Sequence, residues 1–115
     1  MARTLEVRSP FDQAVVGNIG MPDEGDVEDA LKAAEAARAP IQSLQAWERS
    51  QLLQAASERI ASRVEDLATT IALEAGKPIR DARGEASRAV HVFRWASEEA
   101  KRMGGEWMAL DTEPG

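Results

Sequence analysis

One short run, Glu-Ala-Gly-Lys-Pro at residues 74–78, constrains the fold more than any other feature of the chain. Glycine adopts the left-handed conformation that closes a helix, and proline has its φ already set for a first helical turn. The run therefore predicts that Ala75 ends one helix and that Pro78 or Ile79 begins another. Any fold for this chain must place one helix before this tight connector and another helix after it.

A first helix is predicted well before this connector. Asp23 is a residue type that caps helix N-termini, and apolar side chains then recur every three or four residues. That period indicates a helix with one apolar face. The recurring residues are Val27, Ala30, Leu31, Ala34 and Ala37. Pro40 is predicted to end this helix.

Three more helices follow, with a break near residues 62–63 and another at the connector. The residues predicted to face inward are Leu52, Leu53, Ala56 and Ile60 in the second helix, and Val64, Leu67, Ala68 and Ile71 in the third. The fourth helix is the longest, because its small and apolar residues continue from Ile79 to Met103, where Gly104-Gly105 should close it. About 25 residues would extend some 35 to 40 Å, which is long for a domain of this size. This helix is therefore expected to pack against a larger structure.

The first twenty residues have the pattern of strands instead. Residues 5–8 alternate, residues 9–13 are typical of a turn, and residues 14–19 are short and β-branched, which predicts a hairpin over 4–20. Residues 106–110 alternate weakly and are assigned a short final strand. We therefore predict an α-rich α/β segment with this hairpin, a helical region over 23–105 and one last strand. Two strands alone are barely stable, so the hairpin needs a partner surface.

Composition removes several classes of function. With no cysteine and one histidine, the 115 residues offer no thiolate metal site, no disulfide and no cysteine nucleophile. The net charge of −6 opposes nonspecific attraction to phosphate backbones, so no nucleic acid partner is expected. No apolar run reaches the roughly 20 residues of a membrane span, and the start lacks the apolar core of a signal peptide. We expect no membrane association and a cytoplasmic location.

Short motifs follow one another along nearly the whole chain, and their shared order is more specific than any one of them. They are Val7-Arg8-Ser9-Pro10, Val15-Val16-Gly17, Asp26-Val27-Glu28, Glu48-Arg49, Glu65-Asp66-Leu67-Ala68, Gly76-Lys77-Pro78, Phe93-Arg94-Trp95-Ala96 and Gly104-Gly105-Glu106. The series resembles the N-terminal segment of the aldehyde dehydrogenase superfamily. It is most similar to lactaldehyde and non-phosphorylating glyceraldehyde-3-phosphate dehydrogenase-like members.

The resemblance implies a helical lead-in to a Rossmann-type NAD(P)-binding domain. The full enzyme would oxidise an aldehyde, anionic or hydroxylated, to the acid with NAD or NADP, and it would form a homo-oligomer. The family's catalytic Cys and Glu and its cofactor site lie beyond position 115. The isolated chain is therefore expected to be inactive, to bind no cofactor, and to have the remainder of the enzyme as its partner. Residues 111–115 stop where the family's chain continues, which favours a fragment. The alternative is a free-standing helical interaction module without catalytic activity.

Arg88 is the first candidate site residue. In family members that act on phosphorylated or otherwise anionic aldehydes, an Arg in a Glu-x-x-Arg setting on this helix lies at the substrate entrance, and Glu85 with Arg88 resembles that setting. A guanidinium suits bidentate contact with phosphate or carboxylate. The alternative is a solvated helix-face Arg paired with Glu85 or with neighbours near His91.

Glu74 is the second candidate, because the resemblance implies a structural monovalent cation bound by this carboxylate and the backbone carbonyls of Val7 and Arg8. Hard cations prefer oxygen ligands, although an acid near a helix C-terminus is disfavoured by the helix dipole. The alternative is a plain salt bridge or an exposed carboxylate.

Other residues that could suggest a site are assigned structural roles. Lys77 lacks the pattern of a phosphate loop and is interpreted as a solvated connector residue. The glycines form no dinucleotide fingerprint. A lone His91 with no second ligand is interpreted as a surface residue. Trp47, Trp95 and Trp107 are interpreted as core or interface anchors.

Overall fold

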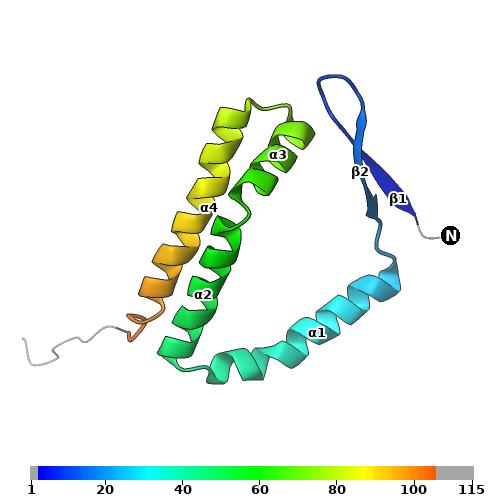
Figure 1. Ribbon diagram of the computed structural model, residues 1–115. Coiled ribbons are helices and arrows are strands. Elements are labelled where there is room, and N and C mark those ends of the chain that lie inside the picture. Colours follow the sequence, from blue (N-terminus) through cyan, green and yellow to red (C-terminus); the bar gives the residue numbers. More distant parts are fainter. Residues whose placement is uncertain (1–2, 106–115) are drawn as a thin grey trace, which may run out of the picture.

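The computed structural model of the chain describes residues 3–105. The elements are β1 (Thr4–Arg8), β2 (Val15–Gly20), α1 (Glu24–Ser43), α2 (Ala46–Ala61), α3 (Val64–Ala75) and α4 (Ile79–Glu99), shown in Figure 1. The predicted hairpin and four helices are confirmed. The strand predicted at residues 106–110 lies outside the described residues.

Strands β1 and β2 pair in antiparallel fashion, from Thr4 opposite Gly20 to Arg8 opposite Val15. The register shifts between Val7 and Arg8, so β2 carries one extra residue there, as in a β-bulge. The loop that joins the strands is closed by its own backbone, because the Ser9 N–H donates to the Ala14 carbonyl at 2.9 Å. Figure 1 shows this loop near the connector between α3 and α4.

Helix α4 packs against both α2 and α3 and forms the centre of the packed region. Between α3 and α4 the core consists of buried alanines, Ala68, Ala82 and Ala86, with larger residues only at its edge. Small side chains let two helices approach closely, since interaxial distance depends on the residues at the contact. Between α2 and α4 the buried Ser57 hydroxyl donates to the Val90 carbonyl at 2.9 Å, which satisfies a polar group removed from water.

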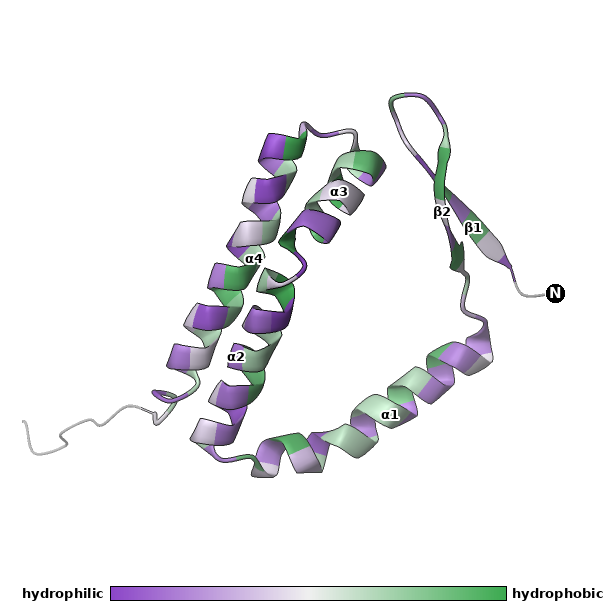
Figure 2. Ribbon diagram, in the orientation of Figure 1, coloured by the Kyte–Doolittle hydropathy of each residue, from purple (hydrophilic) through white to green (hydrophobic). Residues whose placement is uncertain are grey.

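Helix α1 has no buried residue and makes no comparable interface within the described part of the chain. Its start is specified locally by a capping box, in which the Asp26 N–H donates to the Asp23 carboxylate and the Asp23 N–H donates to Asp26, both at 3.0 Å. Figure 2 shows a hydrophobic stripe along α1 that no other element covers. Val27, Leu31 and Ile41 are the large exposed side chains of α1.

Two predicted helix ends are wrong. Helix α1 continues through Pro40 to Ser43, because a proline in the last turn removes a single backbone bond while the Ser43 hydroxyl donates to the Pro40 carbonyl at 2.8 Å. Helix α4 ends at Glu99 rather than at Gly104. Beyond it the Lys101 and Arg102 N–H groups donate three residues back instead of four, which tightens the chain into a turn.

One predicted inward residue is also wrong, because Leu52 is 57% exposed. Helix α2 contacts α4 along a single face, so only the residues on that face are covered, among them Leu53, Ala56 and Ile60. Apart from α4, which contacts both α2 and α3, the described helices pack on one side or not at all. The radius of gyration of the molecule is 21.1 Å, against about 13 Å for a compact domain of this length. None of the described helices has both the length and the apolar character that crossing a membrane requires.

Candidate functional site

The connector between α3 and α4 is held by two independent constraints on Gly76. This residue closes α3 with φ at 64°, in the left-handed region, as the sequence predicted. A Cβ at this position would lie 2.7 Å from the Cγ of Pro10 in the hairpin loop, closer than carbon atoms can approach. Gly76 therefore both reverses the chain and lets the hairpin loop lie against the end of α3.

An open hollow lies between the hairpin loop and this connector. Its lining residues are Ser9, Phe11, Asp12, Ala72, Leu73, Gly76, Lys77 and Pro78. The Ala14 N–H donates to the Asp12 carboxylate at 3.1 Å, and this backbone hydrogen bond, with a contribution from Ser9, lowers the pKa of Asp12. Glu74 is exposed in the last turn of α3 and does not line the hollow, and Val7 and Arg8 lie at the bulge below the loop.

Arg88 lies on α4, exposed to solvent, and within residues 3–105 it forms no ion pair. Val92 and Trp95 follow it at spacings of four and three residues, which places all three along one side of the helix. Trp95 is 71% exposed. An exposed guanidinium beside apolar surface is thus available for a ligand that has both an anionic group and a carbon chain.

The predicted alternative partner of Arg88 is engaged elsewhere, so that part of the interpretation is wrong. The Lys77 ammonium donates to the Glu85 carboxylate at 2.6 Å. This hydrogen bond lowers the pKa of Glu85, to which the Lys77 charge and the more distant Arg88 charge contribute further. Sequence reasoning missed this pair because Lys77 and Glu85 are eight residues apart. The signal that could have revealed the pair was a Lys just before the first turn of α4 and a Glu about two turns into the same helix.

The other candidate residues lie on the surface. His91 is exposed, in agreement with its interpretation. Trp47 is 54% exposed, so a core role is wrong for both Trp47 and Trp95, while an interface role stays a prediction. Trp107 lies outside the described residues.

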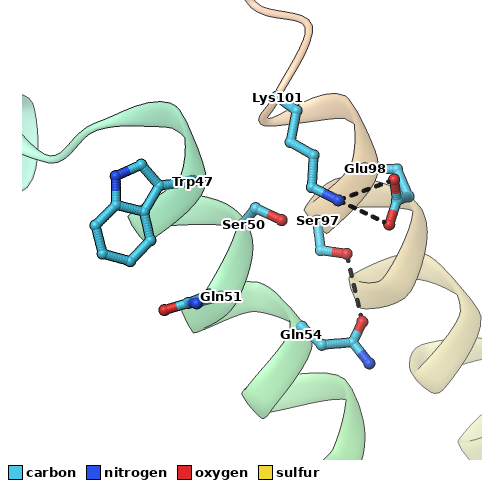
Figure 3. Close-up of a pocket in the computed structure, with 7 residues that line it drawn as sticks. All are labelled: Trp47, Ser50, Gln51, Gln54, Ser97, Glu98 and Lys101. Atoms are coloured by element: carbon cyan, nitrogen blue, oxygen red, sulfur yellow. Dashed lines mark hydrogen bonds and ion pairs between the residues drawn. The ribbon is translucent and has the colours of Figure 1, made fainter.

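A second hollow lies between the start of α2 and the end of α4 (Figure 3). It is lined by Trp47, Ser50, Gln51, Gln54, Ser97, Glu98 and Lys101. Its charged groups pair with each other, since Lys101 donates to Glu98 at 3.2 Å, and the Ser97 hydroxyl donates to the Arg94 carbonyl at 2.7 Å. The lining contains no His and no Cys, and its two charged side chains are paired with each other.

A comparison with protein families matches residues 1–114 to the model described as the aldehyde dehydrogenase family. The chain belongs to the aldehyde dehydrogenase family. The match covers the hairpin, all four helices and the connector, so the collinear motifs recognised in the sequence are confirmed as a family signature.

Individual members of the family show how far this segment reaches. The 3-sulfolactaldehyde dehydrogenase of Priestia aryabhattai is 33% identical over 99% of the chain, which covers 24% of that protein. Aldehyde dehydrogenase 21 from Physcomitrella patens, solved with the reaction product succinate, matches 97% of the chain with a TM-score of 0.90 and 34% identity, and the chain covers 23% of it.

A third member, glyceraldehyde-3-phosphate dehydrogenase from Methanocaldococcus jannaschii complexed with NADP, matches 93% of the chain with a TM-score of 0.86 and 27% identity. The chain covers 24% of that structure. This aldehyde dehydrogenase segment thus spans about a quarter of the length of the relatives it matches.

Proposed function

We propose that the chain is the N-terminal segment of an NAD(P)-dependent aldehyde dehydrogenase that oxidises an anionic aldehyde to the acid. The observation that carries the proposal is that Arg88 is exposed and forms no ion pair within residues 3–105, in a family segment matched over residues 1–114. The names of the three relatives point to the same chemistry. Sulfolactaldehyde, succinate and glyceraldehyde-3-phosphate carry a sulfonate, a carboxylate and a phosphate, and a guanidinium binds each such group through charge-assisted hydrogen bonds.

In this proposal the chain supplies packing and one wall of the substrate entrance, not the reacting groups. The reacting groups would come from the rest of the enzyme, with a cysteine as nucleophile and bound NAD or NADP to supply a hydride acceptor. The whole of residues 1–115 belongs to the cofactor-binding domain as its lead-in. The remainder of the enzyme is the partner, and the complete protein is a cytoplasmic homo-oligomer. The isolated chain does not turn over aldehyde, because it has no thiol nucleophile.

A structural monovalent cation is also part of the proposal, with Glu74 and the carbonyls of Val7 and Arg8 as ligands. Two observations support it. The close contact of Pro10 with Gly76 keeps the hairpin loop beside the end of α3, and the strand register is irregular between Val7 and Arg8. Oxygen donors of this kind suit a hard cation.

Substitution of Arg88 in the complete enzyme tests the proposed substrate class. Arg88→Leu removes a charge-assisted contact worth about 1.5 to 3 kcal/mol, so kcat/KM for an anionic aldehyde should fall about tenfold to a hundredfold. A neutral aldehyde of similar size should lose little. Arg94→Leu is the matched control, because Arg94 is exposed on another side of the same helix. Equal losses for both aldehydes, or no loss for either, would show that Arg88 is only a surface residue.

A further inference from the structure

Arg88 has one acidic neighbour within helical reach, and that neighbour does not bind it. On a helix, side chains three and four residues apart are neighbours, which for Arg88 are Gly84, Glu85, His91 and Val92. Only Glu85 among these carries a negative charge. A Glu three residues before an Arg is a favourable arrangement on a helix, so the open geometry of Arg88 requires a cause.

Other acid–base pairs with the same spacing in the chain indicate how Glu85 and Arg88 would interact if Glu85 had no other partner. Within the described helices and the turn that follows α4, four other pairs have the acid three residues before the base. Three of them form, namely Asp29 with Lys32, Glu98 with Lys101, and Glu99 with Arg102, whereas Glu35 and Arg38 do not pair. Glu85 and Arg88 have the same order and spacing. Pairing is therefore the more common outcome of this spacing within the described helices.

Lys77 is that other partner. Gly76 reverses the chain and Pro78 is the N-cap of α4, so Lys77 lies just before the helix and its ammonium donates to Glu85 at 2.6 Å. The side chains of Lys77 and Glu85 are 44% and 39% exposed, whereas the six side chains of the three local pairs are 50% to 80% exposed. The Lys77–Glu85 pair is therefore somewhat less exposed than the local pairs, and partly covered pairs are screened less by solvent.

We propose that Lys77 is a positioning residue for substrate selection: by engaging Glu85 it leaves the Arg88 guanidinium without its neighbouring carboxylate on α4 and open to an anionic aldehyde. This inference rests on the proposed function, in which Arg88 lies at the substrate entrance. Lys77 touches no substrate. It acts through Glu85, and its effect is to prevent an internal carboxylate from competing with the anionic group of the substrate.

The test is a set of variants in the complete enzyme, assayed with an anionic and a neutral aldehyde of similar size. Lys77→Met keeps the length of the side chain and removes its charge, so Glu85 turns to Arg88. We expect kcat/KM for the anionic aldehyde to fall about two- to fivefold, the range for one exposed ion pair, mainly through KM. The neutral aldehyde should be unaffected. Lys101→Met is the matched control, because it breaks an exposed ion pair with Glu98 at the C-terminal end of the same helix.

Two rescue variants separate positioning from a general structural effect. Lys77→Arg retains the charge and should behave as the wild type. Lys77→Met combined with Glu85→Gln should regain the wild-type kcat/KM for the anionic aldehyde, because the freed side chain no longer carries a competing charge. A loss that Glu85→Gln does not restore, or equal losses for both aldehydes, would overturn the inference.

The proposed function can fail independently of this inference. If Arg88→Leu lowers activity toward the anionic aldehyde and Lys77→Met does not, the substrate class stands and the role of Lys77 is refuted. If Arg88→Leu has no effect on the anionic aldehyde, the proposed substrate class falls, and the selection role of Lys77 falls with it.

Discussion

Two regions of the molecule carry similar sequence patterns and have different surroundings. Helices α2 to α4 bury residues against one another, whereas α1 buries none, although its apolar residues recur at the same helical spacing. Periodicity therefore specifies a helix and one apolar face. It does not specify that the partner of that face lies within these 115 residues. The relatives are longer, since the chain covers about a quarter of each of them.

The two regions also differ in what stabilises them. In the packed region long-range contacts join the helices: buried alanines lie between α3 and α4, and the Arg83 guanidinium binds the Glu65 carboxylate across them at 2.9 to 3.0 Å. In α1 the described interactions are local, such as the capping box and the pair of Asp29 with Lys32. Local interactions alone give marginal helices in water, so α1 is expected to gain its stability from a covering surface.

The sharpest test of this contrast is the same substitution in both regions. Ala86→Leu forces a large side chain into the close contact between α3 and α4, which should lower the free energy of unfolding by about 1 to 3 kcal/mol. Ala34→Leu on α1 should change it by less than about 0.5 kcal/mol, because Ala34 is exposed. Urea unfolding followed by circular dichroism measures both. Similar losses for the two variants would mean that α1 is packed in solution.

The contact between the hairpin loop and the packed region is tested at Gly76. Gly76→Ala should cost about 1 to 2 kcal/mol for the left-handed conformation, with a further loss from the clash with Pro10. Adding Pro10→Ala should recover only the second part. Gly84→Ala is the control with opposite sign. It lies within α4 with open space around it, so alanine should stabilise the chain by about 0.5 to 1 kcal/mol. If Gly76→Ala were neutral, the hairpin loop would not be anchored there.

The exposed face of α1 should be detectable by binding of a hydrophobic dye. Large exposed apolar patches bind such dyes and promote association. Leu31→Glu places a charge in this face and should reduce dye binding and self-association, with less than about 0.5 kcal/mol of change in unfolding free energy. Glu28→Gln is the control, because it changes a polar residue of α1 near Leu31 and should leave dye binding unchanged. A monomeric wild-type chain that melts cooperatively and binds no dye would favour a free-standing module instead.

The smallest effect concerns the exposed ion pair between α3 and α4. Hydrogen bonding to Arg83 lowers the pKa of Glu65 below its ordinary value of 4.5. The stabilisation that the Glu65–Arg83 pair gives the folded state is therefore fully present above pH 4.5. It is lost as the pH falls through the lowered pKa of Glu65 in the folded state. The difference in unfolding free energy between the wild type and Glu65→Gln should shrink on acidification, as urea titrations at several pH values would show. A difference that grows below pH 4.5 would contradict the sign.

Much of the fold could be predicted because its determinants are local. Gly76 in the left-handed conformation, Pro78 before α4 and Asp23 as a cap are properties of single residues and their immediate neighbours. The errors arose where a local rule met a specific geometry. Pro40 removes one backbone hydrogen bond from the last turn of α1, but other donors still close that turn. Helix α4 tightens into a turn after Glu99, before Gly104 and Gly105 are reached. The candidate Arg88 came from the family motif, and the structure adds that it is exposed.

By itself the sequence determined the four helices of residues 3–105 and the position of the connector, because period and turn residues act over a few neighbouring positions. Its collinear motifs indicated the family by resemblance. Only the tertiary structure decided which apolar faces are covered and which acid binds which base. Lys77 and Glu85 meet because the chain reverses at Gly76. Contacts of this kind depend on the orientation of separate elements in space, which no local pattern of residues specifies.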